Sequence, residues 1–369
     1  MATWPKITVC GCGSGAMAMA ADLALLDCSV RLYEVADLKE NLDPIRENGG
    51  ISLTGSPFSG KTGLARLDRI TDNPQEAVEG SQLIFVNVPA TAVDRFVQTL
   101  SPHFSAGQTV VVTTGYWAAL RSRELLMQNR DFDRLNFVEF SIMPYLSEKI
   151  GPAQVHISNY KRELCMAAWP ATKNDVAYSV VQGVYPQVRL TKNVLELNFQ
   201  PGNPGVHPQV TIPNAAFFFE RARVFRFYAE VSECASKLAD AYDAERTRVA
   251  AAFDCETISW PEYCRRVYEY EGKDLYELCA DSTGPHQQSW SSIETTKRLL
   301  VEDLCYSFVP MEALAKVVGV EVPITTAMIE ILAVFTGYDY RGNGLTLKDL
   351  GVQGFNREQI INFVNFGRP

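Results

Sequence analysis

Short apolar runs alternate with helical patterns along the first half of the chain. Ile7–Cys10 has the length and composition of a buried strand, and the unbroken stretch Ala16–Leu26 that follows it predicts a helix. The same alternation predicts the strands Ser29–Tyr33, Leu83–Val88, Thr109–Thr113 and Phe137–Ser141 and the helices Thr91–Leu100 and Ala118–Asn129. Apolar strands that alternate with helices favour an α/β domain with a doubly wound parallel sheet covered on both faces.

Two further patterns complete the predicted architecture. Ile51–Leu67, rich in Gly and Ser, predicts a hairpin inserted into the α/β domain. Gln200–Pro213 is rich in Pro and Gly, and we expect it not to be helical. Helical patterns follow at Val231–Phe253, Trp260–Tyr270, Trp290–Tyr306, Met311–Val318 and Thr325–Phe335. The pattern therefore predicts an α/β domain over 1–191 and a mainly α-helical domain over 192–369, which we expect to close over a bound ligand.

The turn between the first strand and the first helix has the sequence GCGSGA, residues 11–16. In a dinucleotide-binding fingerprint Gly11 permits the tight turn, Gly13 lets the backbone approach a pyrophosphate, and the small Ala16 lets helix and strand pack closely. Ser14 and Gly15 open the helix, whose unpaired N–H groups attract phosphate. The sequence therefore predicts a Rossmann-type cofactor site.

Glu34 ends the second predicted strand, at the spacing where an acidic residue binds the ribose hydroxyls. A carboxylate there repels a 2′-phosphate, so we expect NAD(H) to be preferred, with NADP(H) as the alternative. Pro89 follows another strand at its carboxyl end, where ligands bind in such sheets, and joins the predicted cofactor-binding set. Cys10 and Cys12 have no second pair of ligands nearby, so we expect no metal at this turn.

Composition narrows the possible partners. The chain has 369 residues, 47% hydrophobic and 21% charged, which is typical of a globular protein. Its net charge of −9, without a block of Lys or Arg, argues against nucleic-acid binding. No apolar run is long enough to span a bilayer, no export signal is evident, and the nine scattered cysteines favour reduced thiols. We therefore expect a cytoplasmic protein that binds small molecules and no membrane.

Few side chains outside the fingerprint suggest chemistry. Of the four histidines, we interpret His103 as a solvated loop residue and His156 as structural, and we assign no role to His286. His207 lies in the Pro/Gly-rich crossing between the domains, where an imidazole could exchange a proton, although a structural role fits the pattern too. Arg298 is spaced to pair with Glu302 on one helix, and the residues alone do not single it out.

An ordered set of motifs along nearly the whole chain resembles the opine dehydrogenases, the octopine/nopaline dehydrogenase family. The set begins with the glycine-rich turn and continues to the C-terminal part of the chain. Its other members are VPA (88–90), EFSIMPY (139–145), VHP (206–208), DAER (243–246) with Phe253, RLLVEDL (298–304), FVPMEAL (308–314) and LTLKDLGVQG (345–354).

The resemblance implies a reaction and a set of site residues. Such enzymes use NADH or NADPH to condense the amino group of an amino acid with a 2-oxo acid. The family's catalytic His and Asp match His207 and Asp303, and its substrate-binding Arg matches Arg298. Tyr116 and Trp117 follow a strand near the expected cofactor site, where their bulk could narrow the substrate pocket.

Two alternatives remain open on the sequence. A ketopantoate reductase-like enzyme would reduce a 2-oxo acid to a 2-hydroxy acid, but such enzymes rely on a lysine that has no clear counterpart here. A non-catalytic NAD(H) sensor would have no need for His207 and Asp303 as a proton-transfer pair. The sequence leaves open the substrate pair, the product stereochemistry and whether the chain forms a homodimer.

Overall fold

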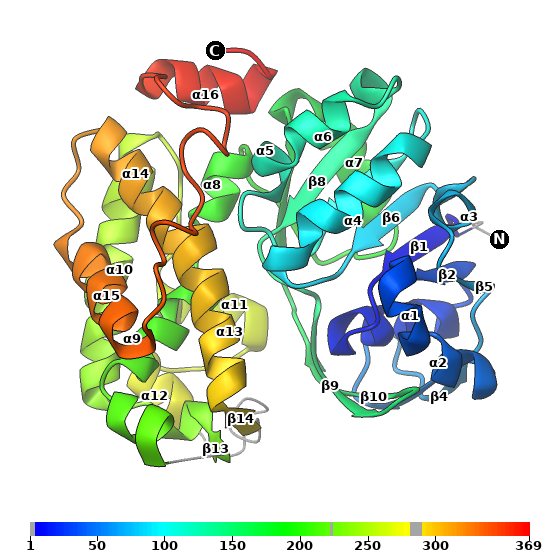
Figure 1. The fold of residues 1–369 in the computed structure, drawn as a ribbon, viewed down its shortest axis with the longest axis horizontal. Helices are drawn as coiled ribbons and strands as arrows, with labels where there is room; N and C mark the ends of the chain where they lie inside the picture. The colour runs from blue at the N-terminus through cyan, green and yellow to red at the C-terminus, as the bar shows by residue number, and fades with distance from the viewer. Residues whose placement is uncertain (1–3, 222–223, 281–289) are drawn as a thin grey trace. The chain divides into compact units, whose positions relative to one another are not determined.

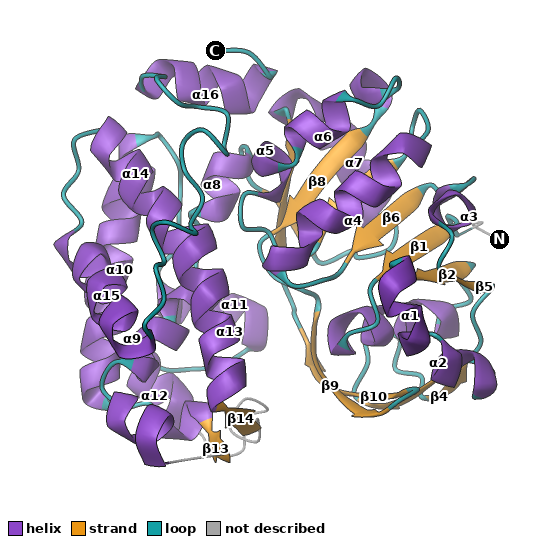
Figure 2. Cartoon of the chain, viewed as in Figure 1, coloured by secondary structure: helices purple, strands orange, loops and turns teal. Residues whose placement is uncertain are grey.

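The computed structural model describes residues 4–221, 224–280 and 290–369 and divides into two compact units, Met1–Leu197 and Asn198–Pro369 (Figure 1). The division lies in α8 (Val194–Asn198), a few residues beyond the predicted boundary at Lys192. The first unit contains a mainly parallel sheet with helices, and the second is mainly helical (Figure 2). The predicted fold class is therefore confirmed.

The central sheet of the first unit has eight strands among the described residues. In spatial order they are β12 (Val188–Leu190), β11 (Leu164–Trp169), β8 (Asn136–Phe140), β7 (Thr109–Val112), β6 (Leu83–Val86), β1 (Ile7–Cys10), β2 (Val30–Tyr33) and β5 (Arg69–Thr71). All neighbours run parallel except β11, which is antiparallel to β8. The order reverses between β2 and β6 on either side of β1, and ligands bind at such a switch point, outside the carboxyl ends of the strands.

A smaller sheet packs against helix α1 (Ser14–Leu25) of the same unit. Its order is β4 (Gly63–Ala65), β3 (Ile51–Gly55), β10 (Gln154–Tyr160) and β9 (Tyr145–Gly151). The antiparallel pairing of β3 and β4 confirms the predicted hairpin. The buried carboxylate of Asp22 on α1 accepts hydrogen bonds from the amides of Phe58 and Ser59, both at 3.1 Å, and so fastens the hairpin loop to the helix.

The other α-helices of the first unit are mostly short. They are α2 (Asp43–Glu47), α3 (Pro74–Val78), α4 (Val93–Leu100), α5 (Ala118–Arg121), α6 (Arg123–Met127) and α7 (Asn174–Gln182). The expectation of one helix over Ala118–Asn129 was wrong, because the helix is interrupted at Ser122, between α5 and α6. There the Ser122 hydroxyl donates to Asp94 at 2.7 Å, and Arg121 pairs with the same carboxylate.

The second unit is built mainly from helices, and its described residues also form a short β-ribbon. Its α-helices are α9 (His207–Thr211), α10 (Glu233–Ala252), α11 (Trp260–Tyr268), α12 (Leu275–Ala280), α13 (Ile293–Asp303), α14 (Val309–Val317), α15 (Pro323–Thr336) and α16 (Arg357–Phe366). A π-helical turn, Leu304–Phe308, joins α13 to α14, and β13 (Val224–Arg226) pairs antiparallel with β14 (Trp290–Ser292).

Two expectations for this unit were wrong. Trp290–Ser292 is a strand rather than the start of a helix, and Ser292 caps α13 by accepting from the amide of Thr295 at 3.2 Å. Gln200–Pro213 contains α9, although we expected no helix there. Pro208 lies in the first turn of α9, where no backbone N–H is needed for the helical ladder, so proline is compatible with the helix start.

Two residues of the DAER motif, Glu245 and Arg246, form hydrogen bonds with other segments of the helical unit. Glu245, buried on α10, accepts hydrogen bonds from the amides of Ile324 and Thr325, each at 2.8 Å, and from the Thr325 hydroxyl at 2.7 Å. It thereby caps α15, whose own N-cap residue supplies no side-chain bond. The buried Arg246 donates to the carbonyls of Phe199 and Ile258, to the Thr257 hydroxyl and to Asp243. These residues therefore have a structural role.

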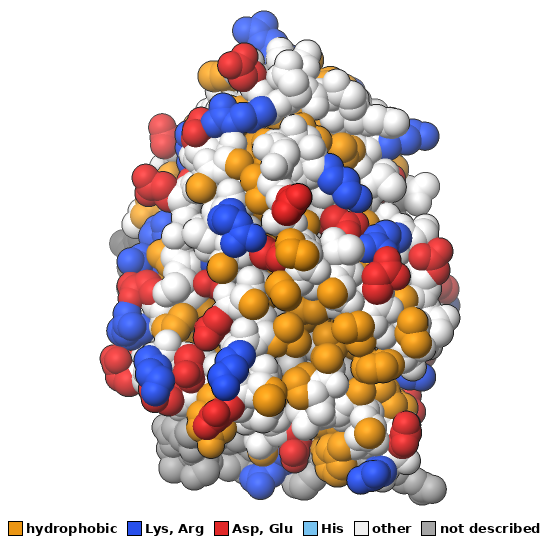
Figure 3. Space-filling view, turned by 90° about the vertical axis from the view of Figure 1, so that its left-hand side faces the viewer, with side chains coloured by type: hydrophobic (Ala, Val, Ile, Leu, Met, Phe, Trp, Pro, Cys, Tyr) orange, Lys and Arg blue, Asp and Glu red, His pale blue; other side chains and the backbone are white. Residues whose placement is uncertain are grey.

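Helix α15 is apolar on more than one side. Thr325, Met328, Ile329 and Leu332 are buried, whereas Ile331, Val334 and Phe335 are exposed. Figure 3 shows apolar side chains gathered between charged ones on the surface that it draws. The apolar pattern thus predicts the helix without indicating its buried side. None of the helices in the described residues combines the length and apolar composition of a membrane-spanning segment.

Removing the Glu245 cap tests this account of the helical unit. We expect Glu245→Ala to lower the free energy of unfolding by about 2 to 4 kcal/mol, because a buried carboxylate loses three hydrogen bonds and the α15 N-terminus loses its cap. Urea denaturation followed by circular dichroism measures the change. Glu330→Ala removes an exposed carboxylate from α15 and should cost less than about 1 kcal/mol. Equal losses in the two variants would contradict the capping role.

Candidate active site

Gly11 makes the sharp turn at the carboxyl end of β1. Its φ of +107° is rarely adopted by residues with a side chain, and a Cβ built there would lie 2.8 Å from both the carbonyl oxygen of Asn87 and Cγ1 of Val88. The Gly11 amide donates to the carbonyl of Tyr33 at 2.8 Å. Only glycine fits this position, in agreement with its predicted part in the turn.

Gly13 has a different environment. It is the N-cap of α1 in an extended conformation, without a side-chain cap, and no atom lies within 4 Å of a Cβ built on it. The first-turn amides of α1 at Ser14, Gly15 and Ala16 therefore begin a helix that no side chain caps. Uncapped amides beside open space form a surface that can receive a phosphate group.

Asn87, between β6 and Pro89, lies beside this turn. Gly15 approaches Asn87 so closely that a Cβ would lie 3.0 Å from its Oδ1 and 2.8 Å from Sδ of Met143. The buried Nδ2 of Asn87 has no hydrogen-bond partner among the residues that the structure describes. Pro89 follows two residues later at the carboxyl end of β6. A donor without a partner beside an uncapped helix start fits a bound anionic or hydroxylated ligand.

Glu34 is buried, with 4% of its surface exposed, directly after β2. Burial raises the pKa of its carboxyl group, against the opposing effect of a hydrogen bond from the amide of Val35 at 3.0 Å. Burial also raises the pKa of the Cys12 thiol to about 12, with Glu34 adding to the effect, and raises that of Cys10 further. Both thiols therefore stay protonated at neutral pH.

The chain after β7 adopts an uncommon backbone conformation. Gly115, Tyr116 and Trp117 have φ angles of +60°, +58° and +62°. Trp117 is buried and forms the N-cap of α5, while the buried carboxylate of Glu139 accepts from the amide of Ala119 at 2.5 Å. Trp117 thus belongs to the core of the first unit, and Tyr116 is the half-buried member of the pair.

In the second unit, the structure brings His207 and Asp303 together although 96 residues separate them. Nδ1 of His207, the first residue of α9, lies 2.8 Å from Oδ2 of Asp303, the last residue of α13. His207 is 4% and Asp303 1% exposed. The ring of His207 meets Phe227 edge to face, with centroids 5.5 Å apart.

The hydrogen bonds of His207 indicate which nitrogen is available. A carboxylate can only accept, so Nδ1 carries the proton donated to Asp303 and Nε2 of the neutral ring presents its lone pair. The hydroxyl of Tyr228 lies 3.3 Å from Nε2, and burial raises the pKa of Tyr228, so the phenol stays protonated. The arrangement can hold a proton on His207 and stabilise it with Asp303.

Arg298 lies on α13 with Asp303 but has a different partner. Its Nη1 donates to Oε1 of Glu302 at 2.9 Å, as the i,i+4 spacing predicts. The Arg298 side chain is 51% exposed and that of Glu302 only 10%. Burial raises the pKa of Glu302, and Arg298 opposes that rise. About half of the Arg298 side-chain surface is thus open to solvent, where a ligand carboxylate can reach it.

The remaining histidines add no second catalytic pair in the described residues. His103 is half-buried in a short 3₁₀ turn, and His156 on β10 shares a hydrogen bond with the Thr54 hydroxyl at 3.0 Å. His286 lies outside the described residues.

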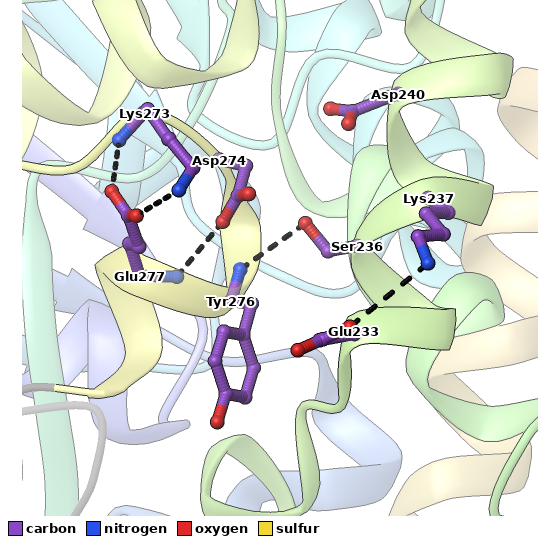
Figure 4. Close-up of a pocket in the computed structure, with 8 residues that line it drawn as sticks. All are labelled: Glu233, Ser236, Lys237, Asp240, Lys273, Asp274, Tyr276 and Glu277. Carbon is purple, nitrogen blue, oxygen red and sulfur yellow. Dashed lines mark hydrogen bonds and ion pairs between the residues drawn. The ribbon is translucent and has the colours of Figure 1, made fainter.

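A pocket of about 310 Å³ lies elsewhere in the helical unit, between α10 and α12 and the loop before α12 (Figure 4). It contains none of the predicted site residues. Much of its charge is paired internally, Lys237 with Glu233 and Lys273 with Glu277. It is lined by Glu233, Ser236, Lys237, Asp240, Lys273, Asp274, Tyr276 and Glu277.

Sequence reasoning missed two residues of these sites. Tyr228, in the short 3₁₀ helix Phe227–Glu230, carries no motif and is brought to His207 only by the folded chain. Asn87 falls inside a predicted strand, and its position one residue before the VPA motif was the available signal.

Comparison with known proteins places these sites in context. Residues 190–336 match the family model described as NAD/NADP octopine/nopaline dehydrogenase, alpha-helical domain. The chain is 28% identical over 358 residues to an opine dehydrogenase of Arthrobacter sp. (strain 1C), covering 96% of this chain and 98% of that protein. It is 23% identical over 373 residues to Protein ocs of Agrobacterium tumefaciens (strain Ach5), covering 98% and 99%.

The fold is also similar to a solved structure of octopine dehydrogenase with NADH and L-arginine. The TM-score is 0.77 at 18% sequence identity, and the match covers 97% of this chain and 98% of that chain.

Two glycine substitutions test which position of the turn requires glycine for its backbone conformation. We expect Gly11→Ala to lower the free energy of unfolding by about 2 kcal/mol or more, because alanine must adopt a positive φ and contact Asn87. Gly13→Ala should leave stability within about 0.5 kcal/mol, since its Cβ meets open space in an ordinary conformation. Thermal unfolding monitored by circular dichroism compares the two. Similar stability of both variants would contradict the role assigned to Gly11.

Proposed function

We propose that this chain is an NAD(P)-dependent oxidoreductase of the opine dehydrogenase type, which condenses the amino group of an amino acid with a 2-oxo acid and reduces the resulting C=N bond. The observation that carries this proposal is the buried pair of His207 and Asp303 in the unit that matches the family's helical domain. A proton-holding pair of this kind suits a reaction that moves protons at nitrogen and oxygen.

The chemistry requires several proton movements. An ammonium group must lose a proton before its nitrogen can attack the carbonyl carbon, and the carbonyl oxygen must gain protons before it leaves as water. The resulting iminium accepts a hydride at carbon, and the secondary amine then takes one proton. A nicotinamide cofactor supplies the hydride when it is bound. The protein's own task is to bind, orient and move protons.

The first unit contains groups that fit a nicotinamide dinucleotide. The uncapped amides of Ser14, Gly15 and Ala16 would hold the pyrophosphate, with Gly11 making the turn and Gly13 leaving room for the approach. Glu34 would accept from the ribose hydroxyls, which favours NAD(H) and leaves NADP(H) as the weaker alternative. Pro89 and the side-chain donor of Asn87 would line the same edge of the sheet.

His207 exchanges the proton and Asp303 supports it. When the imidazole gains a proton at Nε2, the Asp303 carboxylate 2.8 Å from Nδ1 stabilises the positive charge and keeps the ring oriented. Because both side chains are buried, that attraction is weakly screened by solvent.

Arg298 binds a substrate carboxylate. Its guanidinium can form two parallel N–H bonds to a carboxylate, and both the amino acid and the 2-oxo acid carry this group. In the absence of substrate Glu302 occupies one of these donors at 2.9 Å. Glu302 therefore holds the guanidinium of the half-exposed Arg298 side chain beside α13.

The reaction is tested by following NADH absorbance against a grid of 2-oxo acids, each with and without a panel of amino acids. We expect oxidation only when both partners are present, because hydride transfer to C=N requires the condensation. Oxidation with an oxo acid alone would instead indicate a 2-hydroxy acid dehydrogenase of the ketopantoate reductase type.

His207→Ala provides the control for this grid. It should abolish turnover while NADH still binds, since His207 lies in the helical unit and the predicted cofactor residues lie in the first unit. If the unmodified protein binds NADH but oxidises it with no pair of substrates, the result would favour the non-catalytic NAD(H) sensor.

The role of Glu34 predicts cofactor preference. We expect kcat/KM to be higher with NADH than with NADPH, and Glu34→Gln to narrow the ratio by about tenfold, which corresponds to about 1.4 kcal/mol of lost discrimination. Initial rates with both cofactors at a fixed substrate pair give the ratio. Glu40→Gln, at an exposed position, should leave it unchanged. An unmodified protein that favours NADPH tenfold would overturn the assignment of Glu34 to the ribose.

A further inference from the structure

The helical unit contains a third polar group in line with the His207–Asp303 pair. We propose that Tyr228 is a catalytic residue, and that its hydroxyl carries the proton between the substrate and Nε2 of His207. This inference rests on the proposed function. The observation behind it is the distance of 3.3 Å between the Tyr228 hydroxyl and Nε2, the ring nitrogen that Asp303 does not bond.

The geometry of the imidazole leaves one direction for proton transfer. Nε2 of the neutral ring has a single in-plane lone pair, and the Tyr228 hydroxyl lies within hydrogen-bond reach of it. The other nitrogen is engaged by Asp303, and an edge-to-face contact with Phe227 covers the ring. A substrate proton that is bound for His207 therefore meets the Tyr228 hydroxyl first.

Tyr228 is also more exposed to solvent than His207. It is half-buried as a residue, whereas only 4% of the surface of His207 is exposed. A distance of 3.3 Å is long for an O–H···N bond, and catalytic hydrogen bonds commonly shorten when substrate binds.

A phenol suits this position because its oxygen donates one hydrogen bond and accepts others at the same time. Burial raises the pKa of Tyr228, and Asp303, Cys264, Tyr270 and Cys279 around it add to the rise. The phenol therefore keeps its proton at neutral pH. It acts as a relay that always holds one proton rather than as a phenolate base.

The proton balance of the relay is closed. In the acid direction the imidazolium gives its Nε2 proton to the Tyr228 oxygen, while the hydroxyl gives its own proton to the departing oxygen of the substrate. One N–H and one O–H bond break, one O–H bond forms on Tyr228 and one on the substrate. In the base direction an N–H of the ammonium protonates the Tyr228 oxygen, and the hydroxyl proton moves to Nε2.

Tyr228→Phe tests the relay because it keeps the ring and removes only the hydroxyl. With the substrate pair that the unmodified enzyme uses, we expect kcat to fall by about 100-fold or more, while KM and the affinity for NADH stay within about twofold. The single-turnover rate of NADH oxidation is then measured in mixtures of H2O and D2O and plotted against the deuterium fraction. For the unmodified enzyme this plot should be curved, with a quadratic dependence, because two protons move together. In Tyr228→Phe that curvature should disappear.

Tyr263→Phe is the matched control, because it removes a buried tyrosine hydroxyl from α11 of the same unit. It should leave the kinetics unchanged. An unchanged or increased kcat in Tyr228→Phe would overturn the relay and would mean that Tyr228 only packs against His207. If Tyr228→Phe fails to fold, 3-fluorotyrosine at position 228 keeps the hydroxyl and increases its acidity. Because the acidity of the hydroxyl sets how readily it donates its proton, the relay then requires a changed kcat, and an unchanged kcat would overturn it.

A spectroscopic measurement separates this inference from the proposed function. In protein labelled with ¹⁵N-histidine, the Nε2 resonance of His207 should move in Tyr228→Phe and stay fixed in Tyr263→Phe. A stationary resonance would overturn the contact on which the relay depends. Absence of turnover with every amine and oxo acid, together with a moving resonance, would refute the opine-type reaction and leave the Tyr228–His207 bond intact.

Discussion

The hydrogen bond between Asp303 and His207 is the interaction on which the candidate chemistry depends. A carboxylate that is 1% exposed inside a helical unit requires a partner able to share its charge, and the imidazole 2.8 Å away is that partner. The bond joins the start of α9 to the end of α13, so it fixes both the tautomer of the ring and the positions of two helices. It also leaves Nε2 directed toward Tyr228 as the nitrogen that can exchange a proton.

A different constraint governs the first unit, where backbone geometry rather than charge dominates. Gly11 lies so close to Asn87 and Val88 that no side chain fits, and Gly13 begins α1 without a cap beside open space. The order of β1, β2 and β6 places this turn at the switch point of the sheet. The candidate cofactor site is therefore formed mainly by main-chain groups, and the buried Glu34 would add a carboxylate.

The motifs that carry the resemblance to opine dehydrogenases have two kinds of place in the structure. Glu245 of DAER caps α15 and Arg246 binds main-chain carbonyls, so both residues stabilise the helical unit. VHP and RLLVEDL instead supply His207, Arg298 and Asp303. An ordered resemblance thus mixes residues that maintain the fold with residues proposed to perform chemistry, and only the contacts of each side chain separate them.

The sequence by itself determined the central strands, the order of strand and helix, and the glycine-rich turn with Glu34, because these depend on local periodicity and on fixed short spacings. It also determined the Arg298–Glu302 pair, since both residues lie on one helix. It misjudged α9 and the Trp290–Ser292 strand, where proline placement, capping by Ser292 and pairing with β13 override the apolar pattern. Only the tertiary structure decided that Asp303 reaches His207 and that Tyr228 meets the opposite nitrogen. Those contacts join segments far apart in the chain, and the packing that brings them together leaves no periodic signal in the sequence.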